Sequence, residues 1–173
     1  IVPIIRHHVN FQYELCTRKY NYLLKKEEEK KEIQEGLIKA VDCIDLIIEI
    51  LRGSKDVKMA KDCLVLGITD GVKFKSKESE TDAKSLHFTE RQADAILQMR
   101  LQKLIGLELD QLYKENDETL ANIIEYNDIL GSRSKMAKVI IKELEKIKKE
   151  YGRERRTRID NMEEAVVEEK PIE

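Results

Sequence analysis

The sequence TERQADAILQMRLQKLIGLELDQL, residues 89–112, predicts a short helix that is apolar on two faces and must therefore be covered on both. Thr89 followed three residues later by Gln92 is a capping-box pattern, so we expect this helix to begin near Glu90. Gly106 supplies the left-handed residue that commonly ends a helix, and a second helix is expected to follow with LELDQL.

At helical spacing, the apolar residues of this stretch form two stripes that point in different directions. The stripe expected to serve the local core consists of Ala93, Leu97, Leu101 and Leu104. The candidate contact with a second chain consists of Gln92, Ile96, Met99, Arg100 and Lys103. On this assignment, Ile96→Asp would abolish self-association and leave helicity nearly intact, whereas unfolding would mean that the faces are swapped. Periodicity alone favours an ordinary buried helix in a small α-helical domain.

Composition favours long solvated helices over a thick globular core. Of the 173 residues, 38% are charged and 5% aromatic, and there is no Trp. The net charge of −2 excludes a general nucleic-acid-binding character, so any DNA contact must be local.

The three cysteines match no zinc or redox spacing, which indicates reduced thiols. No apolar run reaches the ~18 residues of a membrane span, and we expect a cytoplasmic protein. The first residue is not Met, so we expect a part of a longer polypeptide.

A heptad-like seam runs along the first third of the chain in alternating steps of four and three residues. Its apolar members are Val9, Tyr13, Cys16, Tyr20, Leu23, Leu37, Val41, Ile44, Ile48 and Leu51. In its middle the same register meets Glu27, Lys30 and Gln34, beside the charge run KKEEEKKE that is typical of a solvated helical face. A continuous helix over residues 9–51 would extend on the order of 65 Å and needs a companion.

Residues 107–151 supply that companion. One amphipathic stretch ends at Gly131 and Ser132, and a second one follows with Met136, Ile140, Leu144, Ile147 and Tyr151. Two helical arms joined through a compact middle must pack antiparallel. Within that middle, the polar segment KFKSKESETDAKS, residues 73–85, indicates a surface loop.

Three segments resemble the A subunit of bacterial DNA gyrase, a type IIA topoisomerase. ERQADAILQMRLQKLIGLE resembles its carboxyl-terminal dimer gate, residues 5–52 resemble its outgoing coiled-coil helix, and YGRERRTRI, residues 151–159, resembles the end of its return helix. The resemblance is weakest over residues 53–88. It implies an all-α fold, a long antiparallel coiled-coil hairpin with a small helical globular gate domain at its tip. The domains would then be outgoing helices over 1–52, the gate over 53–106, return helices over 107–158 and an acidic disordered linker over 159–173.

The resemblance implies a mechanical function. In the family, two such tips meet on a twofold axis and form the exit gate for the transported DNA duplex. The implied partners are a second copy, double-stranded DNA and the gyrase B subunit, which handles ATP and Mg²⁺; no membrane, no small-molecule substrate and no cofactor in this chain are implied. Cleavage needs a Tyr preceded by Arg, and none of the six tyrosines matches, so this part is expected to be inactive alone. The alternatives are the A subunit of topoisomerase IV and a non-enzymatic coiled-coil adaptor.

Basic residues gather at two places that an antiparallel hairpin would bring to the same end. They are Arg6, Arg18, Lys19, Lys25 and Lys26 near the start, and Lys146, Lys148, Lys149, Arg153, Arg155, Arg156 and Arg158 near the end. They could form a positive wall near the DNA passage cavity. Salt bridges with interleaved acids such as Glu14, Glu150 and Glu154 are the favoured interpretation.

Overall fold

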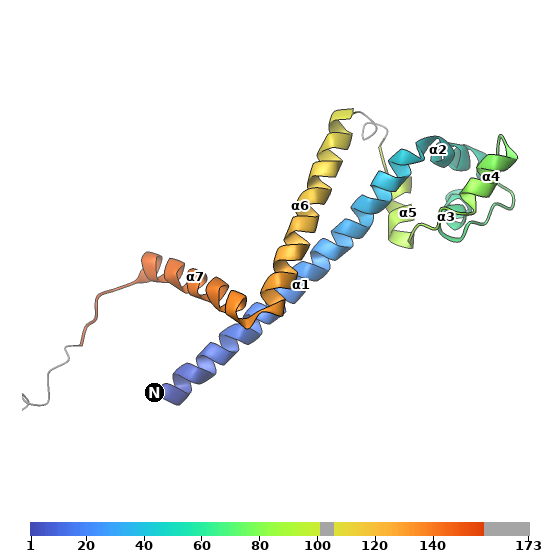
Figure 1. Ribbon diagram of the computed structural model, residues 1–173. Coiled ribbons are helices and arrows are strands. Elements are labelled where there is room, and N and C mark those ends of the chain that lie inside the picture. The colour runs from blue at the N-terminus through green and yellow to red at the C-terminus, as the bar shows by residue number, and fades with distance from the viewer. Residues whose placement is uncertain (101–105, 158–173) are drawn as a thin grey trace, which may run out of the picture.

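The structure describes residues 1–100 and 106–157, and all regular secondary structure in these ranges is helical. In this computed structural model, the helices are α1 (Val2–Asp42), α2 (Ile44–Gly53), α3 (Val57–Leu66), α4 (Lys77–Ala83), α5 (Glu90–Leu97), α6 (Gly106–Gly131) and α7 (Arg133–Tyr151) (Figure 1). The predicted all-α class is therefore confirmed. In the described ranges, no helix combines the length and the apolar character needed to cross a membrane. The predicted acidic linker lies outside the described residues.

Helix α6 returns beside α1 in the antiparallel direction (Figure 1). Asn122 Nδ2 donates a hydrogen bond to Glu27 Oε2 at 3.3 Å. Further along both helices, the rings of Tyr20 and Tyr126 meet edge to face with their centroids 5.5 Å apart. Gln34, in the polar middle of the predicted seam, is 5% exposed. The first arm thus packs on the second through apolar and polar side chains alike.

Helix α7 turns away from α1 after a short break (Figure 1). Ser132 caps its N-terminus by accepting a hydrogen bond from Lys135 N, and Met136 in its first turn is buried beside Cys16. Tyr151, the last apolar residue of the amphipathic stretch predicted to pack on the first arm, is 74% exposed, because α7 has left α1 by that point. The expectation that Tyr151 packs on the first arm is therefore wrong, and a coiled-coil hairpin that includes α7 stays a prediction.

The seam predicted for residues 9–51 changes face at Cys43. This residue interrupts the helix with φ −115° and ψ 34°, and α2 begins immediately after it. The interruption rotates α2, so Ile47 and Ile50 are buried at 1% and 0% exposure. The predicted seam residue Leu51 is instead exposed at 38%. A heptad count assumes an unbroken helix, and the count fails where the backbone leaves helical geometry.

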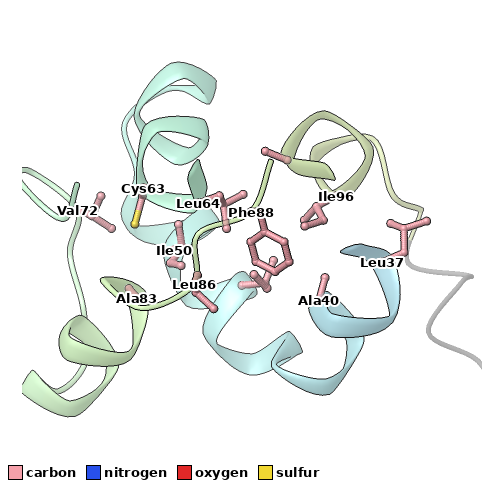
Figure 2. Packing of buried hydrophobic residues seen from close by; sticks show 12 residues of the cluster. Leu37, Ala40, Ile50, Cys63, Leu64, Val72, Ala83, Leu86, Phe88 and Ile96 are labelled. Atoms are coloured by element: carbon pink, nitrogen blue, oxygen red, sulfur yellow. The ribbon is translucent and has the colours of Figure 1, made fainter. Parts of the chain in front are cut away.

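The larger core joins the end of α1 to a compact group of helices, residues 44–100, which we call the tip module. The buried residues of this core are Leu37, Ala40, Ile47, Ile50, Cys63, Leu64, Val72, Ala83, Leu86, Phe88, Ala93 and Ile96. Figure 2 shows the Phe88 ring in the middle of this cluster, between Leu64 and Ile96. The backbone N–H of Phe88 donates to the carbonyl of Leu64 at 2.9 Å. Each fully buried aliphatic or aromatic side chain contributes roughly 1.5–3 kcal/mol to folding.

Helix α4 replaces the surface loop predicted for residues 73–85. Ser76 Oγ accepts a hydrogen bond from Ser79 N at 3.1 Å, and Glu78 and Glu80 occupy the first turn. Acidic side chains are favourable at this end of a helix because of its dipole. Ala83 at the other end is fully buried in the core. A helix could have been predicted here from Ser76 at the capping position and from the two glutamates that follow it. It was missed because the segment has few apolar residues and therefore no helical periodicity.

Candidate interaction site

The capping box at the start of α5 is present as predicted. Thr89 Oγ1 accepts from Gln92 N at 3.2 Å, and Gln92 Oε1 accepts from Thr89 N at 3.0 Å. The helix begins at Glu90. Both of these backbone amides therefore have partners, so the position of α5 along the chain is fixed locally.

The same two residues attach α5 to α1. Gln92 Nε2 donates to the carbonyl of Glu32 at 2.8 Å, and Thr89 Oγ1 donates to Glu32 Oε1 at 2.6 Å. Arg91 lies 3.5 Å from Glu29. The charge run at residues 25–32 is thus more than a solvated face, because two of its glutamates hold the N-terminus of α5.

Gly36 allows this close approach. A Cβ atom at residue 36 would lie 2.8 Å from Gln92 Cβ, closer than real Cβ contacts. Gly36 itself is buried within α1, where glycine costs about 1 kcal/mol relative to Ala. This glycine was not among the residues predicted from the sequence to matter. The close contact could have been predicted from the position of Gly36, because a glycine inside a long helical pattern often has a packing reason.

The division of α5 into two faces needs correction. Ile96, predicted to contact a second chain, is 2% exposed and lies in the core of this chain with Ala93. Leu97, predicted for the core, is only half-buried. The reason is that α5 docks on α1 through Gln92, so its neighbours on the helix surface, Ala93 and Ile96, turn inward with it. Ile96→Asp is therefore expected to unfold the tip module.

Helix α5 also ends earlier than predicted, at Leu97. Met99 follows in a turn, with its N–H donating to the carbonyl of Ile96 at 3.1 Å. The predicted core residues Leu101 and Leu104, and the predicted contact residue Lys103, lie outside the described residues. Gly106 begins α6.

Met99 and Arg100 are the described contact candidates that remain accessible. Met99 is half-buried, and Arg100 is exposed. Together with Ile33 and Leu37 they line a shallow hollow of about 390 Å³. Met99 also lines a second hollow of about 160 Å³ between α1 and Leu112 of α6. A flexible thioether between two hollows is a surface that can adapt to an incoming apolar side chain.

Helix α3 supports α5 from the other side. Lys61 Nζ lies 2.7 Å from Asp94 Oδ1, and this hydrogen bond raises the pKa of Lys61. Nearby, Lys39 Nζ donates to the carbonyl of Leu86 at 2.6 Å and stands 4.8 Å from the centre of the Phe88 ring. In residues 1–100 and 106–157, no three His, Cys, Asp or Glu side chains are grouped to hold a metal ion.

Residues 1–145 match the family model for the A subunit of DNA gyrase/topoisomerase IV. The DNA gyrase A subunit of Streptomyces coelicolor is 36% identical over 155 residues, which are 90% of this chain and 16% of that relative. The corresponding protein of Deinococcus deserti is 36% identical over 173 residues, 98% of this chain and 19% of that relative. That of Clostridium acetobutylicum is 36% identical over 160 residues, 92% of this chain and 17% of that relative.

These matches define the class of protein, a helical part of the A subunit of a type IIA topoisomerase. The chain belongs to the family of DNA gyrase/topoisomerase IV A subunits. It spans between 16% and 19% of the length of these three relatives.

Proposed function

We propose that this chain is the non-catalytic arm and exit gate of a gyrase A subunit. In this role α1 and α6 form the arm, and the tip module pairs with its copy on a twofold axis. The observation that carries the proposal is the accessible edge formed by the turn after α5, where Met99 stands between two hollows and Arg100 is exposed. That edge belongs to the stretch whose residues resemble the family's dimer gate.

The gate would hold two A subunits together while a DNA segment is cut, and then release the transported duplex. The proposed partners of the whole enzyme are duplex DNA and the B subunit, through which ATP and Mg²⁺ act. To hold two subunits together and then release the duplex, the tip must be rigid and the contact between the two tips must be reversible. The capping box, Gly36 and the Glu32 contacts supply rigidity, because they fix α5 on α1.

Sedimentation equilibrium of the chain tests the proposal. We expect a monomer–dimer equilibrium that Met99→Asp shifts to monomer, because it places a charge in a contact that excludes water. The melting temperature should fall somewhat, since Met99 packs against the core, so circular dichroism at the working temperature must show that the helices of the variant persist. The matched control is Ile124→Asp, which places the same charge at a 70% exposed position on α6 and should leave the dimer intact.

A chain that stays monomeric at high concentration would refute the gate proposal for this part and favour a tip that binds a different protein. Equal dimerisation of wild type and Met99→Asp would place the contact elsewhere on the chain. Both results can be read from the same concentration series.

A further inference from the structure

The first part of α1 carries a second row of apolar side chains, on a different side of the helix from the packed one. We call this row the outer stripe, and its members are Ile4, Phe11, Leu15 and Tyr22. They are between 41% and 73% exposed. The packed side is marked by Cys16, which is buried with Met136 of α7. Figure 1 shows this part of α1 extending beyond the end of α6. The outer stripe is therefore open to a partner.

The spacing of the outer stripe is that of a coiled-coil seam. With His8 and Arg18 included, its positions follow alternating steps of four and three residues. At about 1.5 Å per residue the stripe extends roughly 27 Å. A helix that lies on a membrane needs a broad apolar face, whereas a narrow seam fits between the side chains of one neighbouring helix. The spacing thus favours a helix over a bilayer as the occupant.

The outer stripe lies in a basic part of an acidic chain. Residues 1–26 contain five Lys or Arg residues and one acidic residue, Glu14, although the net charge of the whole chain is −2. Glu14 is already bound to Arg18. Lys26 flanks the stripe, and its Nζ stands 5.3 Å from the centre of the Tyr22 ring. The rim of the stripe is consequently positive.

The glutamates that follow in α1 are directed to other helices of the chain. Glu27 accepts a hydrogen bond from Asn122 of α6, and Glu29 lies 3.5 Å from Arg91 of α5. These carboxylates therefore serve the packing of the arm and the tip. A partner that covers the outer stripe meets an apolar row with a positive rim.

A second copy of α1 is a poor occupant of the outer stripe. In a parallel pair of copies, each Arg18 would face the same residue of the other copy across the seam, and like charges in such a contact are unfavourable. A helix with carboxylates beside its own apolar seam would instead place negative charge near Arg18, Lys19 and Lys26. Spacing and charge agree on this kind of occupant.

We propose that the outer stripe docks an amphipathic helix with an acidic rim that belongs to a partner protein. Phe11 and Leu15 supply the apolar contact in the middle of the stripe, and the basic residues select the acidic rim. This surface lies at the opposite end of α1 from the tip module (Figure 1). The docking is therefore independent of the proposed gate.

Fluorescence anisotropy of a labelled synthetic peptide, titrated with the full chain, tests this proposal. The acidic peptide has about three heptads with Leu at both seam positions and Glu at both flanking positions. We expect it to bind saturably. A basic peptide with Lys in place of Glu, and a polar peptide with Gln in place of Leu, should each bind at least about tenfold more weakly, because each lacks one of the two complementary features.

Two variants of the chain locate the binding surface. The stripe variant changes Phe11 and Leu15 to Gln together and should weaken binding of the acidic peptide at least about tenfold. The matched control changes Leu66 of α3 and Ile124 of α6 to Gln, which removes apolar side chains that are 61% and 70% exposed, and it should bind like the wild type. Circular dichroism of both variants checks that the helices persist.

The proposal is wrong if the acidic peptide does not bind at about 100 μM chain, or if the stripe variant and the control lose the same affinity. Equal binding of the acidic and basic peptides would refute the acidic rim. Loss of self-association by the stripe variant in sedimentation would identify a second copy as the occupant, and binding to phosphatidylserine vesicles without peptide binding would indicate a membrane; either result overturns the proposal. Met99→Asp, which tests the gate, should keep its affinity for the acidic peptide.

Discussion

The contact between Gly36 and Gln92 makes a strong and testable demand on the fold. In Gly36→Ala, the new Cβ would lie 2.8 Å from both Gln92 Cβ and Gln92 Cδ, so rotation of the distal amide alone cannot relieve the overlap. Gln92 must then retract from α1. It would lose its hydrogen bond to the Glu32 carbonyl, and with it the geometry of the capping box.

The change in the free energy of unfolding caused by Gly36→Ala is the difference between lost contacts and gained helix propensity. Two hydrogen bonds contribute about 1 kcal/mol each, and overpacking costs about 1–3 kcal/mol. Against this, Ala stabilises a helix interior by up to about 1 kcal/mol relative to Gly. We therefore expect Gly36→Ala to lower the free energy of unfolding by about 2–4 kcal/mol. For a chain of this length each kcal/mol shifts Tm by about 2–4 °C, so the fall in Tm should be about 4–16 °C.

Thermal unfolding followed by circular dichroism measures this shift, and Gly131→Ala is the matched control. No heavy atom lies within 4 Å of a Cβ built at Gly131, so this substitution should leave Tm unchanged or raise it. In a Gln92→Ala background, Gly36→Ala should cost less than in the wild type, because most of the overlapping atoms are gone. If Gly36→Ala melts at or above the wild-type temperature, helix propensity dominates and the close contact does not position α5.

Three further predictions concern the tip module. Ile96→Ala should lower the free energy of unfolding by about 2–5 kcal/mol and Leu97→Ala by clearly less, measured by urea titration; equal costs would contradict the buried position of Ile96. Burial raises the pKa of the Cys63 thiol, so this group contributes stability that is present below the ordinary thiol pKa and is lost as the pH rises above it; Cys63→Ala should reduce that alkaline loss in melts at increasing pH, and an unchanged pH profile would refute it. His87 is exposed and its φ of 42° lies in the left-handed region, which glycine adopts without strain. The free energy of unfolding of His87→Val should therefore be lower than that of His87→Gly by about 1–2 kcal/mol, as measured by urea titration. A reversed order would show that the backbone at residue 87 is unstrained.

The sequence predicted features that depend on a few neighbouring residues. The start of α5 was predicted correctly because Thr89 and Gln92 determine the cap by themselves. The side on which Ile96 lies could not be predicted in the same way, since it depends on where α1 approaches α5. That approach depends on Gly36, whose role is visible only when Gln92 is seen against it. A helical wheel gives the angle between two stripes, and only tertiary contacts decide which stripe is covered.

The break at Cys43 escaped prediction for a different reason. Residues 41–44 contain neither Gly nor Pro, so no local signal marks the interruption. The tip core, which buries Ile47 and Ile50 on the far side of the break, sets the backbone there. Continuing the seam into α2 would have exposed both residues. Burying them gains roughly 3–6 kcal/mol, which is enough to offset the hydrogen bonds lost at one helix break.

Helix α1 joins two apolar cores through a polar middle. At one end, Leu37 and Ala40 belong to the tip core, and at the other Cys16 packs with Ile129 and Met136. Between the two cores, α1 meets α6 through polar groups such as Glu27 and Asn122. Among the described residues the two cores share no buried side chain, and both α1 and α6 run from one core to the other, so a movement at the tip can reach the base through the backbones of these two helices. A continuous helix of 41 residues is suited to this, because its hydrogen bonds run along its axis and resist extension.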